Sequence, residues 1–355
     1  MSARIPFDER GGVLRGALDL VSGRFPSFVF GGPVGDMLPV FHFHDETRES
    51  LLPKLRHLAE NGYRTVGSDE IAAYARKETR LAPRSVALCF DDAWASLGDV
   101  AAPLLKEHGL TAITYAIPAR MSDAGPSPFV TWPDLAALAA SGVVDVQCHT
   151  YSHSRVFCGT EVVGFVDPSY GSTLLLNRPQ LTPPPRLRFL TPDDLGAPIY
   201  PARSRMSGAA RAQIPIEVHE RCVQHVAREG GAAFFSKSGW RSELEQAAAA
   251  ATPANTAAVE RPADRQKAVE DELDRGRAML NDRLKIRSVN HACLPWGVSS
   301  DETAKALARL GFRSAFANRM RGMHAVRAGD DPFWLKRLPN RYILRLPGRG
   351  RRWFA

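Results

Sequence analysis

The sequence lacks the features of a membrane-spanning or conventionally exported chain. No uninterrupted apolar run approaches the ~20 residues that a helix needs to cross a bilayer. The first 35 residues also lack a basic start followed by an apolar stretch and a small-residue cleavage site. We therefore expect a protein that is not secreted by the ordinary route and that works in the cytoplasm.

Cysteine is scarce and its spacing is uninformative. The five cysteines are odd in number, and none forms a short metal-binding pair. Most fall within apolar stretches that read as strands or helices. This usage excludes a disulfide scaffold and favours buried, reduced thiols.

Acidic residues are absent after Asp331, so the net positive charge of the chain is concentrated in the segment that follows this residue. The seven cations that follow account for all but one unit of the net charge of +8. Together with Trp353 and Phe354 they suit peripheral contact with an anionic membrane, at the inner membrane face. A solvated tail remains an alternative, and no nucleic acid is expected because no recognition motif accompanies the charge. The cations are Lys336, Arg337, Arg341, Arg345, Arg349, Arg351 and Arg352.

Two adjacent carboxylates end the most apolar predicted strand. Val86–Phe90 reads as a strand buried on both faces, and Asp91 and Asp92 follow it directly. In parallel α/β folds the carboxyl ends of the strands face the ligand. Two carboxylates in a poorly solvated place need a cationic or protonated group beside them, and a metal ion would serve.

Two histidines follow another apolar strand, residues 143–148. His149 and His153 are four residues apart, so one helical turn would bring both imidazoles to the same face. Two imidazoles and a carboxylate suit zinc or a similar divalent ion, with a coordination position left open for catalysis. Each pattern alone is also compatible with ordinary surface residues, but their order and strand-end positions make the combination specific.

These motifs resemble those of the NodB-homology polysaccharide deacetylases (carbohydrate esterase family four). C-F-D-D-A at 89–93 is similar to the family's T-F-D-D-G, and H-T-Y-S-H at 149–153 to its H-[ST]-x-x-H. C-L-P-W-G at 293–297 resembles the P-Y-G segment of the third motif. The resemblance covers roughly residues 36–155 and 265–345.

The resemblance implies roles for the polar residues of the first two motifs. It makes Asp91 the catalytic base, and Asp92, His149 and His153 the metal ligands. The metal it implies is most readily Zn²⁺, and Co²⁺, Ni²⁺ and Mn²⁺ also accept this ligand set.

The third motif departs from the usual pattern. Many family members carry an arginine that pairs with the catalytic aspartate, but Cys293 stands at that position. We expect the bound metal to replace this cation as the group that keeps Asp91 ionised. The resemblance to the family's third-motif loop makes the backbone N–H of Trp296 the candidate oxyanion contact, and Pro295 and Trp94 are further candidate substrate contacts.

A histidine on the first strand is the candidate general acid. His42 and His44 alternate onto one face, and His44 lies nearest the carboxyl end of the strand. The segment resembles the Y-H-D of the biofilm poly-glucosamine deacetylases, in which the strand histidine is the acid. His291 and His324 are weaker candidates, and a structural histidine at position 44 remains an alternative.

The alternation of apolar strands and helices predicts parallel βα units. Their number favours an α/β fold, a distorted (β/α) barrel of seven or eight parallel strands with a large insertion at the catalytic mouth. Predicted strands are 38–43, 63–66, 86–90, 111–117, 143–148, 289–294 and 313–316. Predicted helices are 49–60, 69–75, 100–108, 132–140, 268–284 and 301–310.

The domain boundaries follow from this pattern. We expect an N-terminal extension over 1–35, the barrel over 36–345 and a basic tail over 346–355. Residues 159–264 interrupt the barrel with a Pro-rich stretch followed by helices at 215–228 and 241–251. We expect this insertion to act as a lid or acceptor-binding subdomain, in which Arg186, Arg188, Arg203 and Arg205 either bind an anionic group or face solvent.

The function predicted is metal-dependent hydrolysis of the N-acetyl amide of an amino sugar, in a glycan or a lipid-linked precursor. Two alternatives stay open. One is removal of a formyl or other acyl group from a nucleotide- or lipid-linked sugar, and the other is a non-catalytic glycan-binding relative.

Overall fold

The computed structural model describes residues 25–251, 259–286, 288–318 and 324–352, and most of the predicted extension 1–35 lies outside these ranges. The chain divides into two compact units. We call residues 153–268 the insertion unit. The described residues up to Ser152 and from Val269 onward form the barrel unit.

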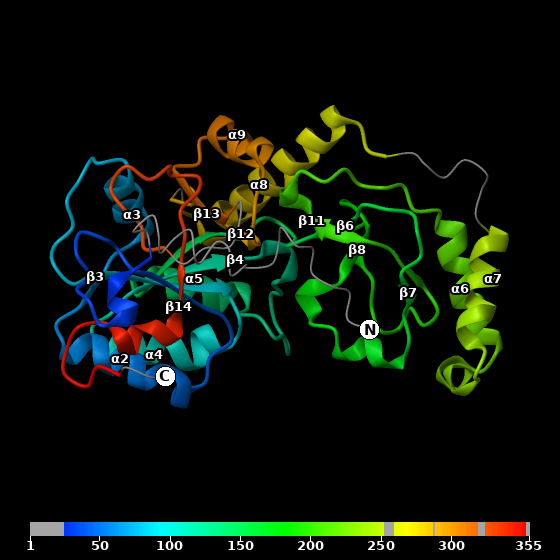
Figure 1. Cartoon of the computed structure of the whole chain (residues 1–355), viewed down its shortest axis with the longest axis horizontal. Coiled ribbons are helices and arrows are strands. Elements are labelled where there is room, and N and C mark those ends of the chain that lie inside the picture. Colours follow the sequence, from blue (N-terminus) through cyan, green and yellow to red (C-terminus); the bar gives the residue numbers. More distant parts are fainter. Residues whose placement is uncertain (1–24, 252–258, 287, 319–323, 353–355) are drawn as a thin grey trace. The chain divides into compact units, whose positions relative to one another are not determined.

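A parallel sheet forms the barrel unit (Figure 1). Seven strands follow one another in the order β13-β12-β5-β4-β3-β1-β14, and every pairing along this path is parallel. The expected α/β fold, a distorted barrel of parallel strands, is confirmed. The strands are β1 (Val40–Phe43), β3 (Ser85–Asp92), β4 (Ala112–Ala116), β5 (Val144–Cys148), β12 (His291–Val298), β13 (Ser314–Asn318) and β14 (Leu338–Pro339), and β2 (Arg64–Thr65) pairs with β3 beside this path.

A short late segment links the two ends of this sheet. Leu335 forms a parallel bridge with Phe316 of β13, and three residues later Leu338 pairs with Phe41 of β1. The stretch from Leu335 to Pro339, which includes β14, therefore runs between β13 and β1. It carries Arg337 between its two points of attachment.

Helices follow the strands as predicted, with local differences. They are α2 (Arg48–Glu60), α3 (Ser68–Ala75), α4 (Ala102–Glu107), α5 (Trp132–Ala140), α8 (Pro262–Leu284) and α9 (Asp301–Arg309). The helix α3 begins at Ser68, one residue before the predicted position 69, and the N–H and hydroxyl of Ser68 both donate to Asp145. Ahead of α4, Leu97–Ala101 forms a π-helical turn, so this helical region starts before the predicted residue 100.

The core supports the strand that bears the two aspartates. All eight residues of β3 are buried, as expected for a parallel strand covered on both faces. The four cysteines Cys89, Cys148, Cys222 and Cys293 are buried, and all five are free thiols. The prediction of buried, reduced cysteines is confirmed at these four positions.

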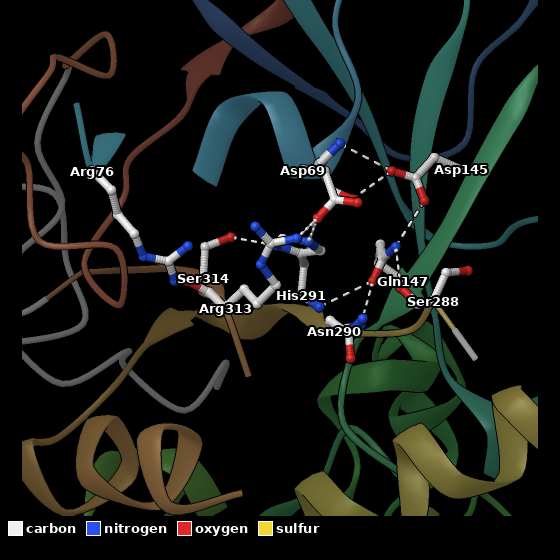
Figure 2. A network of polar contacts seen from close by, with 10 residues as sticks. Asp69, Arg76, Asp145, Gln147, Ser288, Asn290, His291, Arg313 and Ser314 are labelled. Carbon is white, nitrogen blue, oxygen red and sulfur yellow. Dashed lines mark hydrogen bonds and ion pairs between the residues drawn. The ribbon is translucent and has the colours of Figure 1, made fainter. Parts of the chain in front are cut away.

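A polar network joins β5, β12, β13 and the start of α3 in the barrel unit (Figure 2). Gln147 accepts hydrogen bonds from the backbone N–H groups of Asn290 and His291, both at 3.0 Å, and donates to Asp145 at 2.7 Å. The buried ring of His291 lies between Ser314 (2.8 Å) and Asp69 (3.1 Å). Both ring nitrogens of His291 are thus engaged by these two partners, which makes it a poor candidate for the general acid.

The insertion unit has its own small sheets and core. A four-stranded sheet has the order β11-β6-β8-β9, and β7 pairs with β10. Two of the four arginines considered for anion binding are engaged within this unit, Arg188 by Asp194 and Arg205 by Glu260 at 2.6 Å. The elements are β6 (Arg155–Phe157), β7 (Gly164–Phe165), β8 (Pro179–Thr182), β9 (Arg188–Phe189), β10 (Pro198–Ile199), β11 (Ala202–Ser204), α6 (Ile216–Arg228) and α7 (Trp240–Ala251).

The described part of the basic tail packs against the barrel unit. Arg345 donates to the carbonyl of Val29 at 3.0 Å, and Arg351 donates to the carbonyls of Phe28 (2.9 Å) and Gly32 (3.0 Å). These bonds join the tail to η2 (Ser27–Phe30). Trp353 and Phe354, which the membrane prediction also used, lie outside the described residues. Within the described ranges, no helix is both long and apolar enough to cross a membrane.

Candidate active site

The aspartate pair lies where β3 ends in a sharp turn. Asp91 and Asp92 are buried, and the backbone of Asp92 (φ 70°) and Ala93 (φ 54°) adopts the left-handed region. The family pattern has glycine where Ala93 stands, and glycine is the residue that takes this conformation without a steric penalty. This chain thus makes the same turn with alanine, which favours the left-handed conformation less than glycine does.

Asp92, His149 and His153 form a group that could hold a metal ion. Each offers one ligand atom, these atoms lie within 4.8 Å of one another, and all three residues are buried. Nε2 of His149 is 3.3 Å from Oδ1 of Asp92. One carboxylate oxygen and two imidazole nitrogens are a donor set typical of zinc and similar ions.

The orientation of His149 fits a ligand role. Its Nδ1 lies 2.6 Å from the carbonyl oxygen of Cys293, which can only accept a hydrogen bond. Nδ1 therefore carries a proton, which leaves Nε2, on the side of Asp92, as the nitrogen that would bind a metal ion. A backbone carbonyl that fixes the tautomer in this way is typical of metal-binding histidines.

The two histidines come together by a route that the sequence reasoning did not anticipate. Residues 149–153 form no helical turn. Instead Thr150 (φ 64°) and His153 (φ 54°) adopt left-handed backbone conformations within a loop. The two imidazoles lie close together as the i, i+4 spacing predicted, but the expected helical turn was wrong.

Asp91 has an arginine partner that the sequence analysis missed. Both guanidinium nitrogens of Arg337 donate to its carboxylate, at 2.6 and 2.7 Å. The expectation that no arginine accompanies Asp91 is therefore wrong: the cation comes from the segment that closes the sheet rather than from position 293. In the sequence we counted Arg337 among the cations of a membrane-binding segment.

Arg337 is enclosed as well as paired. Its side chain is 11% exposed and that of Asp91 3% exposed, and the guanidinium lies over the rings of Tyr115 and Phe316. Burial alone would raise the pKa of Asp91, but the charge and hydrogen bonds of Arg337 lower the pKa overall. The only sequence signal for this partner was the need of a buried carboxylate for a cation.

His44 lies beside the same carboxylate. Its Nε2 is 3.7 Å from Oδ2 of Asp91, and its side chain is 55% exposed. The rings of His42 and His44 are in edge contact, with 5.7 Å between their centroids. His44 thus combines closeness to Asp91 with access to solvent, whereas His324 is buried.

Trp94 contacts a carboxylate. Its indole N–H donates to Oδ2 of Asp92 at 3.0 Å, and its ring packs against Phe129 with 4.8 Å between centroids. The structure therefore directs the polar atom of Trp94 to a candidate metal ligand. In the third motif, Pro295 is buried, and Trp296 (φ 56°) lies in the part of β12 where the register with β13 shifts, between Cys293 and Val298.

A second buried group, Asp91, His149 and Cys293, also has ligand atoms within 4.8 Å of one another. The two carboxylate oxygens of Asp91 are both bound by Arg337. This pairing makes the group a poor metal site, and the Asp92 group is the better candidate.

The comparisons with known proteins agree with the motifs. Residues 78–170 match the model of the polysaccharide deacetylase family, and this segment contains both the aspartate pair and the two histidines. The resemblance drawn from the sequence is therefore confirmed over this segment. No curated protein matches the chain.

One of the solved structures similar to this chain shares its fold, and two others are more distantly similar. IcaB from Ammonifex degensii has a TM-score of 0.50 and 18% identity, over 86% of this chain and 92% of that chain. A de-N-acetylase from Aggregatibacter actinomycetemcomitans has a TM-score of 0.48 and 15% identity, over 84% of this chain and 97% of that chain. The BpsB deacetylase domain from Bordetella bronchiseptica has a TM-score of 0.48 and 16% identity, over 80% and 89%.

Proposed function

We propose that this chain is a divalent-metal-dependent hydrolase that removes the N-acetyl group from an amino-sugar unit of a glycan or glycan precursor. The observation that carries the proposal is the placement of two adjacent buried aspartates beside two histidines, within a segment that matches the polysaccharide deacetylase model. Such a site suits amide hydrolysis, which needs a base for water, a charge for the carbonyl oxygen and an acid for the leaving amine.

Asp91 is the proposed base. Arg337 keeps its carboxylate ionised and fixes the plane of the carboxyl group through two parallel bonds. An ionised, oriented carboxylate is ready to take a proton from water without first having to lose one. The pairing also fixes the position of Asp91 relative to His44.

Asp92, His149 and His153 are the proposed metal ligands. A divalent ion held there, most readily Zn²⁺, supplies positive charge that polarises a carbonyl oxygen and makes water easier to deprotonate. The residues around it orient the ligands: the carbonyl of Cys293 binds His149, and the indole N–H of Trp94 binds Asp92. The backbone N–H of Trp296, with Pro295 beside it, is the proposed contact for the developing oxyanion.

His44 is the proposed general acid, because its ring lies beside Asp91 and still reaches solvent. His44→Ala should lower the rate of the chemical step by ~10²-fold and leave the metal content unchanged, since His44 is not among the ligands. The rate is measured by acetate release and the metal content by elemental analysis. The matched control is His324→Ala; if that variant loses turnover while His44→Ala does not, the acid is His324.

Acetate release from a panel of N-acetylated sugars tests the activity itself. The panel contains free oligosaccharides, nucleotide-linked sugars and lipid-linked sugars, each with an N-formyl counterpart. Acetate release that depends on the metal and on Asp91 is the expected result. Formate release alone would identify a deformylase, and sugar binding without any release would identify a glycan-binding relative.

We further propose that the protein acts in the cytoplasm, in exopolysaccharide biosynthesis, with peripheral contact at the inner membrane face. Arg349 and Arg352 are exposed cations in the described tail. Near an anionic surface each cation contributes about 1 kcal/mol, and salt weakens the attraction.

Reversing these two charges (Arg349→Glu with Arg352→Glu) should abolish salt-sensitive co-sedimentation with anionic vesicles. Co-sedimentation is compared between anionic and zwitterionic vesicles at low and high salt. Equal partitioning of wild type and variant would remove the membrane contact and leave the proposed hydrolase activity untouched.

A further inference from the structure

The loop between the two histidines is held in an unfavourable backbone conformation. Thr150 and His153 both have positive φ angles, a region that residues with a Cβ atom adopt rarely. Neither a helix nor a strand fixes this stretch. Contacts from other parts of the chain must therefore hold the shape that directs the two imidazoles.

A buried carboxylate on α8 supplies two of these contacts. Glu272 is 7% exposed, and its two oxygens bind one residue in the middle of the loop. Oε2 accepts the backbone N–H of Ser152 at 2.9 Å, and Oε1 accepts the Ser152 hydroxyl at 2.6 Å. Burying a carboxylate is costly unless such bonds satisfy it, and bonds to a charged acceptor are short and orienting.

The backbone of α8 lies directly against the same loop. The N–H of Tyr151 donates to the carbonyl of Glu272 at 2.8 Å. A Cβ atom at Gly276 would lie 2.8 Å from Sγ of Cys148 and 2.9 Å from the backbone nitrogen of Tyr151, so no larger residue fits without displacing the loop. Arg275 adds a contact over the Tyr151 ring at 4.3 Å.

These three helix residues share one face. Positions 272, 275 and 276 have the i, i+3, i+4 spacing that places side chains together on a helix. The helix thus presents to the loop the carboxylate of Glu272, the guanidinium of Arg275 and, at Gly276, a position without a side chain. If the helix held the loop by apolar packing alone, the hydrogen bonds of Glu272 and the contact of Arg275 with Tyr151 would not be required.

We propose that Glu272 is a positioning residue for the metal ligands. Its carboxylate fixes Ser152, and α8 thereby sets the loop from which His149 and His153 reach the metal. The inference rests on the proposed function, because it gives Glu272 its role through the same metal site. Partners that hold metal ligands in place typically contribute 10- to 100-fold in metal affinity.

The experiment measures metal binding directly. Zinc affinity is determined by competition with a chromophoric chelator, and the ligand geometry by the absorption spectrum of the cobalt-loaded protein. The variants are Glu272→Ala, Glu272→Gln and Gly276→Ala. The control is Asp274→Ala, which removes the same charge from the same helix at a side chain that is 55% exposed. Thermal unfolding of the metal-free proteins shows whether each variant is folded.

Glu272→Ala should bind zinc ~10- to 100-fold more weakly than the control and have an altered cobalt spectrum. Glu272→Gln should recover most of the affinity, because its oxygen still accepts the N–H of Ser152 and its amide donates to the hydroxyl. Gly276→Ala should weaken binding without any change of charge. It also keeps the inference testable if Glu272→Ala does not fold.

Two results would overturn the inference, and they are distinguishable. If wild type binds zinc and cobalt while Glu272→Ala matches the control in affinity and spectrum, Glu272 has no positioning role. If wild type binds neither ion, the proposed metal site fails, and the role of Glu272 fails with it.

Discussion

Asp91→Asn is expected to lower turnover by ~10²-fold or more while the protein keeps its metal. The amide has nearly the shape of the carboxylate, but it cannot take a proton from water. Because Asp91 is bound by Arg337 and is not among the three residues of the Asp92 group, metal content should not change. Acetate release and elemental analysis of the same preparation measure the two quantities.

The neighbouring aspartate provides the matched comparison. Asp92→Ala should lose metal and turnover together, because the variant lacks the only carboxylate among the proposed ligands. Near-normal turnover in Asp91→Asn would show that the base is another group. Full metal content in Asp92→Ala would show that the ion is bound elsewhere.

Arg337→Met is expected to lower the free energy of unfolding by ~3–5 kcal/mol, because it leaves the buried charge of Asp91 without a partner. Methionine keeps much of the volume and none of the charge. Denaturant unfolding of the metal-free protein measures the loss. The control is Arg309→Met, which breaks a pair that is 45% and 30% exposed and should cost less than about 1 kcal/mol.

A double-variant cycle separates the pairing from the packing of Arg337. Adding Asp91→Asn to Arg337→Met removes the unpaired charge, so the double variant should be more stable than Arg337→Met alone. Additive losses would show that Arg337 contributes through contacts with Tyr115 and Phe316 rather than through Asp91.

Local patterns were sufficient to predict the helices α2, α3, α4, α5, α8 and α9 and the strands of the barrel unit apart from the two-residue strand β14. The strand that bears the aspartates was evident from a continuous apolar run, and β3 is buried throughout. The helix at 132–140 was predicted with its observed bounds. Thr131 caps it by accepting the N–H of Asp134, and Gly142 follows its end.

Interactions between distant residues were beyond the same reasoning. Arg337 reaches Asp91 across 246 positions, and no local pattern distinguishes it from the exposed arginines around it. Glu272 was equally hidden, since a glutamate in a long helix usually faces solvent. The left-handed loop between His149 and His153 depends on α8, so its shape could not follow from its own five residues.

The position of Arg337 in the chain has a consequence for biogenesis. The barrel unit begins with β1 but closes only when the stretch from Leu335 to Pro339 joins β13 to β1. During synthesis from the N-terminus, Asp91 and the histidines leave the ribosome long before their last partner does. Until the final segment docks, Asp91 lacks its arginine partner, and the proposed base takes its paired, oriented form only once this segment is in place.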